Sequence, residues 1–109
     1  MAESPFISVV VPLYNEFDNI PKLLEELTKV LDSIKTEYEI ILSDDGSEDN
    51  SFEIIRQYHK QDKRVIGISL SKNFGHQIAL LAGMEKAKGD IIITMDADTF
   101  ATPDALKKM

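Results

Sequence analysis

The 109-residue sequence predicts an α/β fold in which a mainly parallel sheet carries helices on both faces. Four runs rich in Val and Ile, at residues 6–13, 38–42, 65–70 and 91–94, are typical of buried strands. Segments with apolar residues at helical spacing separate these runs. Strands that alternate with helices favour parallel pairing through right-handed crossovers, so the two observations together indicate this class.

Composition supports one folded domain and excludes several classes of function. With 43% hydrophobic and 28% charged residues, the chain can bury one core. The formal net charge of -7 argues against a nucleic-acid partner. The absence of cysteine excludes disulfides and thiolate chemistry. We find no apolar run as long as a membrane span and no signal-type leader, so we expect a soluble, cytoplasmic chain.

The first strand and helix are predicted from residues 6–34. The strand stops near Pro12, because proline cannot donate to the sheet ladder. A polar loop follows, and Asp18 or Asn19 caps the next helix, with Pro21 in its first turn. One apolar face at helical spacing predicts packing on the sheet, through Ile20, Leu23, Leu24, Leu27, Leu31 and Ile34.

The middle of the chain predicts two more strand and helix pairs. The strand at 38–42 leads to a helix capped by Asp49 or Asn50 that reaches about residue 61, with Phe52, Ile55 and Tyr58 turned inward. The strand at 65–70 leads to a helix over 75–87. This third helix is apolar nearly all round, which predicts deep burial.

The stretch that begins at Ile91 predicts a fully buried, central fourth strand, because it is continuously β-branched. Asp96 and Asp98 stand where the strand ends. Thr102 and Pro103 then form a strong helix start. Since a sheet is normally flanked further, we expect residues 1–109 to be the front part of a larger protein.

Polar side chains follow all four predicted strands. Because the carboxyl ends of parallel strands meet at one edge of the sheet, we expect these clusters to form one nucleotide pocket. The expected residues are Tyr14 and Glu16, then Asp44, Asp45 and Gly46, then Lys72, Asn73, His76 and Gln77, and finally Asp96 and Asp98. Taken singly, each cluster also fits an ordinary turn, a helix cap or a solvated loop.

The chemistry of these clusters suits a phosphate-bearing ligand with a divalent cation. Asp96 and Asp98 can share one cation, which offsets the repulsion between an acidic chain and a diphosphate. Lys72 supplies a positive charge, and N–H groups at the start of the following helix are further donors. Gly46 permits close approach of the backbone.

Five motifs occur in order from about residue 7 onward: Val-Val-Pro-Leu-Tyr-Asn-Glu, Ser-Asp-Asp-Gly-Ser, Ser-Lys-Asn-Phe-Gly-His-Gln, Ala-Gly-Met-Glu-Lys-Ala-Lys-Gly-Asp and Met-Asp-Ala-Asp. Together they resemble family 2 glycosyltransferases, and most closely the branch of dolichol- and polyprenyl-phosphate sugar synthases. The resemblance implies a Rossmann-like three-layer α/β/α sandwich of the nucleotide-diphospho-sugar transferase type. Residues 1–109 would then be the N-terminal, nucleotide-sugar-binding part of a truncated domain.

The same resemblance implies an inverting glycosyltransferase that moves a sugar from a UDP-sugar or GDP-sugar donor to a polyprenyl phosphate or a saccharide acceptor. By resemblance, Pro12, Tyr14 and Glu16 would lie against the base and ribose, and Asp45 would receive the edge of the base. In the matching Asp-x-Asp motif, Asp96 would contact the sugar or ribose, and Asp98 would hold Mg²⁺ or Mn²⁺ on the diphosphate.

The chain also departs from that branch. Thr99 and Phe100 follow the motif where the branch usually has Leu-Gln, and a phenyl ring cannot coordinate a cation. The second half of the family domain, with its acceptor site and catalytic base, is missing, so the catalytic residues stay unknown and we expect the chain alone to be inactive. A full-length form would associate with the cytoplasmic face of a membrane, and an unpaired sheet edge could pair with a second copy.

Three other functions remain open at this point. A haloacid-dehalogenase-type phosphatase also uses Asp-x-Asp after an apolar strand, but Phe100 stands where that pattern has Thr or Val. A receiver-like domain has its acidic pair after the first strand, where this chain has Pro12, Leu13 and Tyr14. A nucleotide-binding module without turnover would bind a nucleoside diphosphate with metal and transfer nothing.

Overall fold

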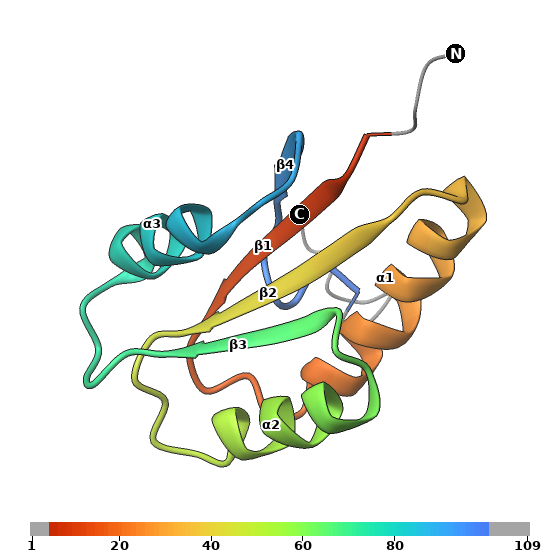
Figure 1. Cartoon of the computed structure of the whole chain (residues 1–109). Helices are drawn as coiled ribbons and strands as arrows, with labels where there is room; N and C mark the ends of the chain where they lie inside the picture. Colours follow the sequence, from red (N-terminus) through yellow and green to blue (C-terminus); the bar gives the residue numbers. More distant parts are fainter. Residues whose placement is uncertain (1–4, 101–109) are drawn as a thin grey trace.

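Residues 5–100 are described by a computed structural model, and they form a four-stranded sheet with helices on both faces. The elements in chain order are β1 (Ile7–Leu13), α1 (Ile20–Ile34), β2 (Tyr38–Asp44), α2 (Ser51–Gln61), β3 (Val65–Ser69), α3 (His76–Lys86) and β4 (Ile91–Thr94). The strands lie in the order β3-β2-β1-β4, and every neighbouring pair is parallel. Helices α1 and α2 cover one face and α3 covers the other, which gives three layers (Figure 1).

The two central strands form the core of the sheet. Ile7 pairs with Tyr38 at the start of β1 and β2, and Leu13 pairs with Asp44 at their ends. Alternate residues of both strands face α1 and α2, where they join the main apolar core. Strand β2 runs to Asp44, two residues beyond the predicted end, because Ser43 and Asp44 continue the pairing with β1 and β3.

Helix α1 has the predicted apolar face, with one exception. Its four buried leucines and Ile20 pack on the sheet, whereas Ile34 is 55% exposed, so its predicted inward position was wrong. Ile34 is the last helical residue and follows Leu31, the last buried residue of the helix. Asn19 occupies the predicted N-cap, but its side chain donates to Glu16 Oε1 at 2.9 Å instead of bonding to the helix.

Helix α2 begins at Ser51 with Asn50 at the N-cap position, and the side chain of Asn50 makes no capping bond. Asp49 caps the helix instead, since its Oδ1 accepts the N–H of Ser51 at 2.9 Å. Ile55 is fully buried, and Phe52 and Tyr58 are partly buried against the core. The predicted inward face of this helix is therefore confirmed.

Two predicted burials were wrong. Strand β4 is at the edge of the sheet, and Ile91, Ile92 and Ile93 are 40–45% exposed. Helix α3 buries only Ala79 and Gly83 among its apolar positions, because within residues 5–100 nothing packs on its outer side. A continuous apolar run indicates that a segment favours burial. It does not indicate which strand is central in the sheet, or which element packs on the outer side of a helix.

No helix within the described residues is long and apolar enough to cross a membrane. The helix start predicted at Thr102 and Pro103 lies outside those residues.

Candidate functional site

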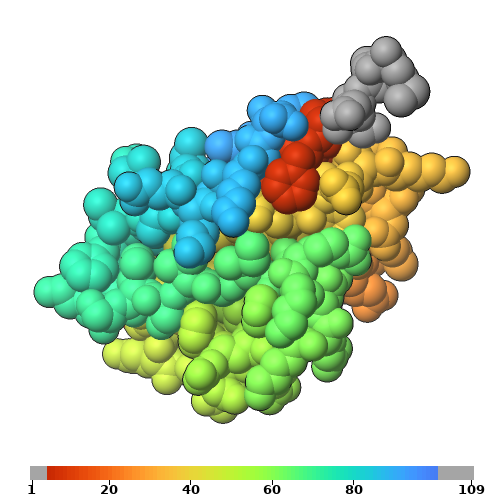
Figure 2. Space-filling view, viewed as in Figure 1, coloured from red at the N-terminus to blue at the C-terminus, as the bar shows by residue number. Residues whose placement is uncertain are grey.

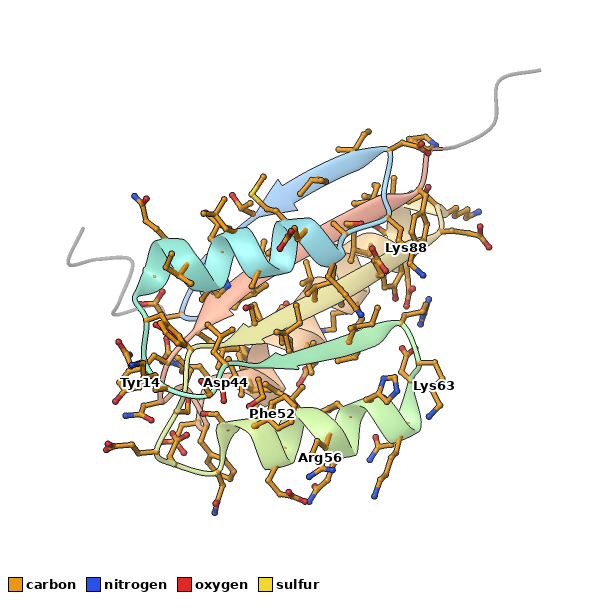
Figure 3. The ribbon with its side chains drawn as sticks, turned by 60° about the vertical axis from the view of Figure 1, so that its left-hand side comes forward. Tyr14, Asp44, Phe52, Arg56, Lys63 and Lys88 are labelled. Atoms are coloured by element: carbon orange, nitrogen blue, oxygen red, sulfur yellow. The ribbon has the colours of Figure 1, made fainter. Side chains whose placement is uncertain are left out.

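The carboxyl ends of β1, β2 and β4 meet around a hollow of about 360 Å³. Figure 3 shows Tyr14 and Asp44 at this end of the sheet. Eight of the residues expected at the site line the hollow, namely Pro12, Tyr14, Glu16, Asp45, Asn73, His76, Asp96 and Asp98. The predicted convergence of strand ends is therefore present in the structure.

Four expected residues, Asp44, Gly46, Lys72 and Gln77, do not line this hollow. Gly46 has φ +68, and a Cβ built on it would lie 2.3 Å from the carbonyl carbon of Lys72. The close approach that this glycine permits is thus between two loops of the chain itself. The ammonium group of Lys72 lies 5.3 Å from the ring centre of Phe74 and points to that ring.

Asp45 anchors the loop that precedes α3. Its two carboxylate oxygens accept the backbone N–H groups of Phe74, at 2.8 Å, and Gly75, at 3.0 Å. The side chain is only 3% exposed, yet it lines the hollow. A carboxylate has about four acceptor positions, so Asp45 can hold this loop and still accept a hydrogen bond from a ligand.

Asn15 joins the loops after β1 and β2. Its Oδ1 accepts the N–H groups of Glu48, at 2.8 Å, and Asp49, at 3.3 Å, while its own N–H donates to Ser47 Oγ at 2.8 Å. Its φ of 53 places it in the left-handed region, which asparagine tolerates better than most residues. Because Tyr14 and Glu16 flank Asn15 in the chain, these hydrogen bonds help to position both residues.

Asp44 lies beneath this junction and is 2% exposed. Its carboxylate accepts the hydroxyl of Ser47, the residue that also receives the N–H of Asn15. Burial raises the pKa of Asp44; the hydrogen bonds from Ser47 offset part of this rise, and the charges of Asp49 and Asp45 add to it. Asp44 does not line the hollow, and its contacts are with the junction of the two loops.

Asp96 and Asp98 lie in a turn directly after β4. Met95 donates its N–H to the carbonyl of Val10 at 3.2 Å, and Ala97 is buried in the main core. Thr99 closes the turn, because its N–H and its hydroxyl both donate to the carbonyl of Asp96. With Ala97 held inward, the two exposed carboxylates on either side of it border the hollow.

The donor set of this turn fits a hard divalent cation. Within residues 5–100 no group of three or more His, Cys, Asp or Glu side chains forms a metal site. Mg²⁺ is commonly held by one or two carboxylates together with phosphate oxygens and water, so two aspartates are sufficient when a diphosphate is bound.

The start of α3 supplies the rest of the lining. Asn73 and His76, which the sequence placed among the donors, border the hollow, whereas Gln77 does not. Sequence reasoning missed Gly75 and Ala79. Their small size is the only signal that could have found them, since a bulkier side chain would fill the space.

Residues 8–109 match the sequence model of the family described as Glycosyl transferase family 2. The undecaprenyl-phosphate 4-deoxy-4-formamido-L-arabinose transferase of Aeromonas hydrophila is 41% identical over 104 residues, which are 94% of this chain and 32% of that protein. The uncharacterized glycosyltransferase YkcC of Bacillus subtilis is 44% identical over 102 residues, again 94% and 32% of the two chains. The chain thus spans about a third of the length of these relatives.

Solved structures agree with the fold. The crystal structure of S. aureus TarS 1-349 in complex with UDP-GlcNAc has a TM-score of 0.75 and 31% identity. The match covers 94% of this chain and 29% of the TarS chain. The mannosyltransferase PcManGT from Pyrobaculum calidifontis, in complex with GDP-Man and Mn2+, has a TM-score of 0.70 at 24% identity, with 86% and 28% covered. The predicted three-layer fold of the nucleotide-diphospho-sugar transferase type is confirmed.

Proposed function

Since the chain belongs to glycosyl transferase family 2, we propose that it is the nucleotide-sugar-binding part of an inverting glycosyltransferase. The reaction would move a sugar from a nucleoside diphosphate sugar to a polyprenyl phosphate. Family membership favours this reaction over the phosphatase and receiver functions that the acidic clusters also suggested.

One observation carries the proposal: the ends of three strands bring an aromatic ring and four carboxylates to a single hollow at the carboxyl edge of a parallel sheet. The ring belongs to Tyr14, and the carboxylates to Glu16, Asp45, Asp96 and Asp98. Ligands of such sheets bind at this edge, and an aromatic ring beside hydrogen-bond acceptors suits a base and a ribose.

The arrangement suggests a role for each group. Tyr14 flanks the base, and Glu16 accepts a ribose hydroxyl. Asp45 accepts an N–H from the edge of the base while it keeps its two bonds to the loop before α3. The N–H groups at the start of α3, where His76 borders the hollow, would bind the diphosphate, because a helix N-terminus favours negative charge.

Asp98, with Asp96 beside it, would hold Mg²⁺ or Mn²⁺ at the diphosphate. A bound cation there neutralises the charge that develops on the leaving nucleoside diphosphate. Asp96 also borders a second, smaller hollow with His76 and Thr94, which is where the sugar of the donor would extend.

The acceptor follows from the relatives' names. Several curated relatives, 37–42% identical to this chain, are described as undecaprenyl-phosphate transferases. We therefore propose a polyprenyl phosphate as the acceptor, in preference to a saccharide.

Calorimetric titration of the chain with UDP and with GDP, each with and without Mn²⁺, tests the donor site. We expect one nucleotide to bind in a metal-dependent manner, and Asp98→Asn to weaken that binding by about tenfold or more. Asp18→Asn is the matched control, because Asp18 is exposed and does not line the hollow. Equal loss in both variants, or binding of neither nucleotide by the wild-type chain, would contradict the proposed site.

A further inference from the structure

A separate hollow, of about 540 Å³, lies at the open edge of β3. It is bordered by α2, by the loop that leads into β3 and by the last turn of α3. Figure 2 views the molecule from the side on which these three segments reach the surface. In Figure 3, Phe52 and Arg56 lie along α2, and Lys63 lies near the end of this helix, at the opposite end of the sheet from Tyr14.

This basic hollow, as we call it, carries four basic side chains: Arg56, Lys60, Lys63 and Lys86. No Asp or Glu lines it, although acidic residues outnumber basic ones by 19 to 12 in the chain. Within residues 5–100, none of the four cations lies in an ion pair. The basic hollow and the hollow at the carboxyl ends of the strands therefore have opposite charge, since carboxylates dominate the latter.

The floor of the basic hollow is apolar. Phe52, Ile55 and Ile66 line it, and the guanidinium of Arg56 lies 6.0 Å from the ring centre of Phe52. The hollow is open because β3 pairs only with β2 among the described strands. An apolar floor with a basic rim matches a ligand that is itself anionic and partly apolar.

The donors of the basic hollow do not form a rigid cage for a small anion. Three of the four cations are lysines, which carry a mobile point charge on a flexible stem. His59 also lines the hollow, and its Nδ1 is already used in a hydrogen bond of 2.6 Å with the carbonyl of Val65. Mobile ammonium groups suit a surface of many anionic groups better than one phosphate held in a fixed geometry.

The overall negative charge of the chain does not oppose such a contact. At physiological ionic strength the Debye length is about 8 Å. The described part of the chain measures 47 × 33 × 27 Å, so carboxylates at the far side are screened from a surface that touches the basic hollow. The local charge therefore decides the interaction.

We propose that the basic hollow and its rim of Arg56, Lys60, Lys63 and Lys86 dock the chain on an anionic lipid bilayer. The choice of a bilayer rests on the proposed function, because a polyprenyl phosphate acceptor resides in one. The lysines neutralise lipid headgroups, and the apolar floor faces the interface. The hollow at the carboxyl ends of the strands, where the sugar donor would bind, stays clear of this contact. It shares no lining residue with the basic hollow.

Flotation of the chain with lipid vesicles tests the surface without any sugar transfer. Vesicles of phosphatidylcholine with about one third phosphatidylglycerol are compared with vesicles of phosphatidylcholine alone. The test variant is Lys60→Gln with Lys63→Gln and Lys86→Gln. The matched control, Lys22→Gln with Lys29→Gln and Lys35→Gln, removes the same charge from α1 and its C-cap, away from the basic hollow.

We expect the wild-type chain to bind only the anionic vesicles, and the test variant to lose about tenfold or more of that binding. The control should keep most of it, and raising the salt to about 0.5 M should release the chain. Equal loss in both variants, equal binding to neutral vesicles, or no binding by the wild type would overturn the proposal. Competition by soluble polyglutamate that exceeds competition by added anionic vesicles would indicate an acidic protein partner instead, and would also overturn it.

The nucleotide titration described above separates this proposal from the proposed function. Loss of vesicle binding with intact nucleotide binding would reject only the docking surface. Loss of nucleotide binding in the wild-type chain, with vesicle binding retained, would reject only the donor site.

Discussion

The side-chain oxygen of Asn15 accepts the backbone N–H of Glu48 at 2.8 Å, which ties the end of β1 to the loop after β2. The next two residues reinforce this link, because Glu16 donates its N–H to Ser51 Oγ and Phe17 donates its N–H to Asp49. The loop that carries Tyr14 and Glu16 is thus positioned by the neighbouring loop.

Asn15→Gly should destabilise the chain by about 1 kcal/mol and weaken nucleotide binding. Glycine keeps the left-handed backbone but removes the acceptor for two N–H groups. Asn15→Asp keeps the acceptor and should restore most of the loss. Urea unfolding and nucleotide titration measure the two effects, and equal behaviour of the Gly and Asp variants would show that the side-chain oxygen is unimportant.

Gly46→Ala should be far more damaging than Gly75→Ala. Both glycines have positive φ, +68 and +109, so both variants carry backbone strain. Only at position 46 would the added methyl meet backbone, at 2.3 Å from Lys72, whereas nothing lies within 4 Å at position 75. We expect Gly46→Ala to lower the free energy of unfolding by at least about 2 kcal/mol more. Equal losses of unfolding free energy in the two variants would mean that the loop at Gly46 does not approach the loop at Lys72 as closely as described.

Asp45→Asn should loosen the start of α3. An amide offers one acceptor oxygen, so one of the N–H groups of Phe74 and Gly75 loses its partner. We expect a loss of about 1–3 kcal/mol in unfolding free energy and faster hydrogen exchange at these two amides. Asp18→Asn should leave both quantities unchanged. Unaltered exchange at both amides in Asp45→Asn would contradict the anchoring role.

The stability of the chain should depend on pH through Asp44. Its folded pKa is raised mainly by burial, so the folded chain holds this proton more tightly than the unfolded chain. The contribution is fully present below the unfolded pKa and is lost as the pH rises through the raised folded pKa. As the pH rises above the unfolded pKa of Asp44 and through its raised folded pKa, wild type should therefore lose stability relative to Asp44→Asn in urea unfolding.

Asp62 provides the comparison of opposite sign. Hydrogen bonds from Arg64 lower the pKa of Asp62, so its contribution is present above the unfolded pKa and is lost as the pH falls through the folded pKa. Wild type should gain stability relative to Asp62→Asn as the pH rises. The same pH trend in both comparisons would contradict the opposite pKa shifts of Asp44 and Asp62.

Much of the fold and of the site could be predicted from the sequence, because the spacing of apolar residues along the chain indicates which side chains are buried. The apolar face of α1, the inward side of Ile55 on α2 and the position of Asp96 and Asp98 after an apolar strand all follow from spacing along the chain. The convergence of strand ends follows from parallel pairing alone, since all carboxyl ends then share one edge.

The tertiary structure alone decided how segments that are distant in the sequence meet. The run at Ile91 reads the same for a central and an edge strand, and only the pairing of β4 with β1 placed it at the edge. Asp45 and Gly46 were expected to contact a ligand, and only the folded structure showed that both also contact the loop before α3. Burial patterns describe each segment against water, whereas strand order and loop contacts depend on which other segment the folded chain brings alongside.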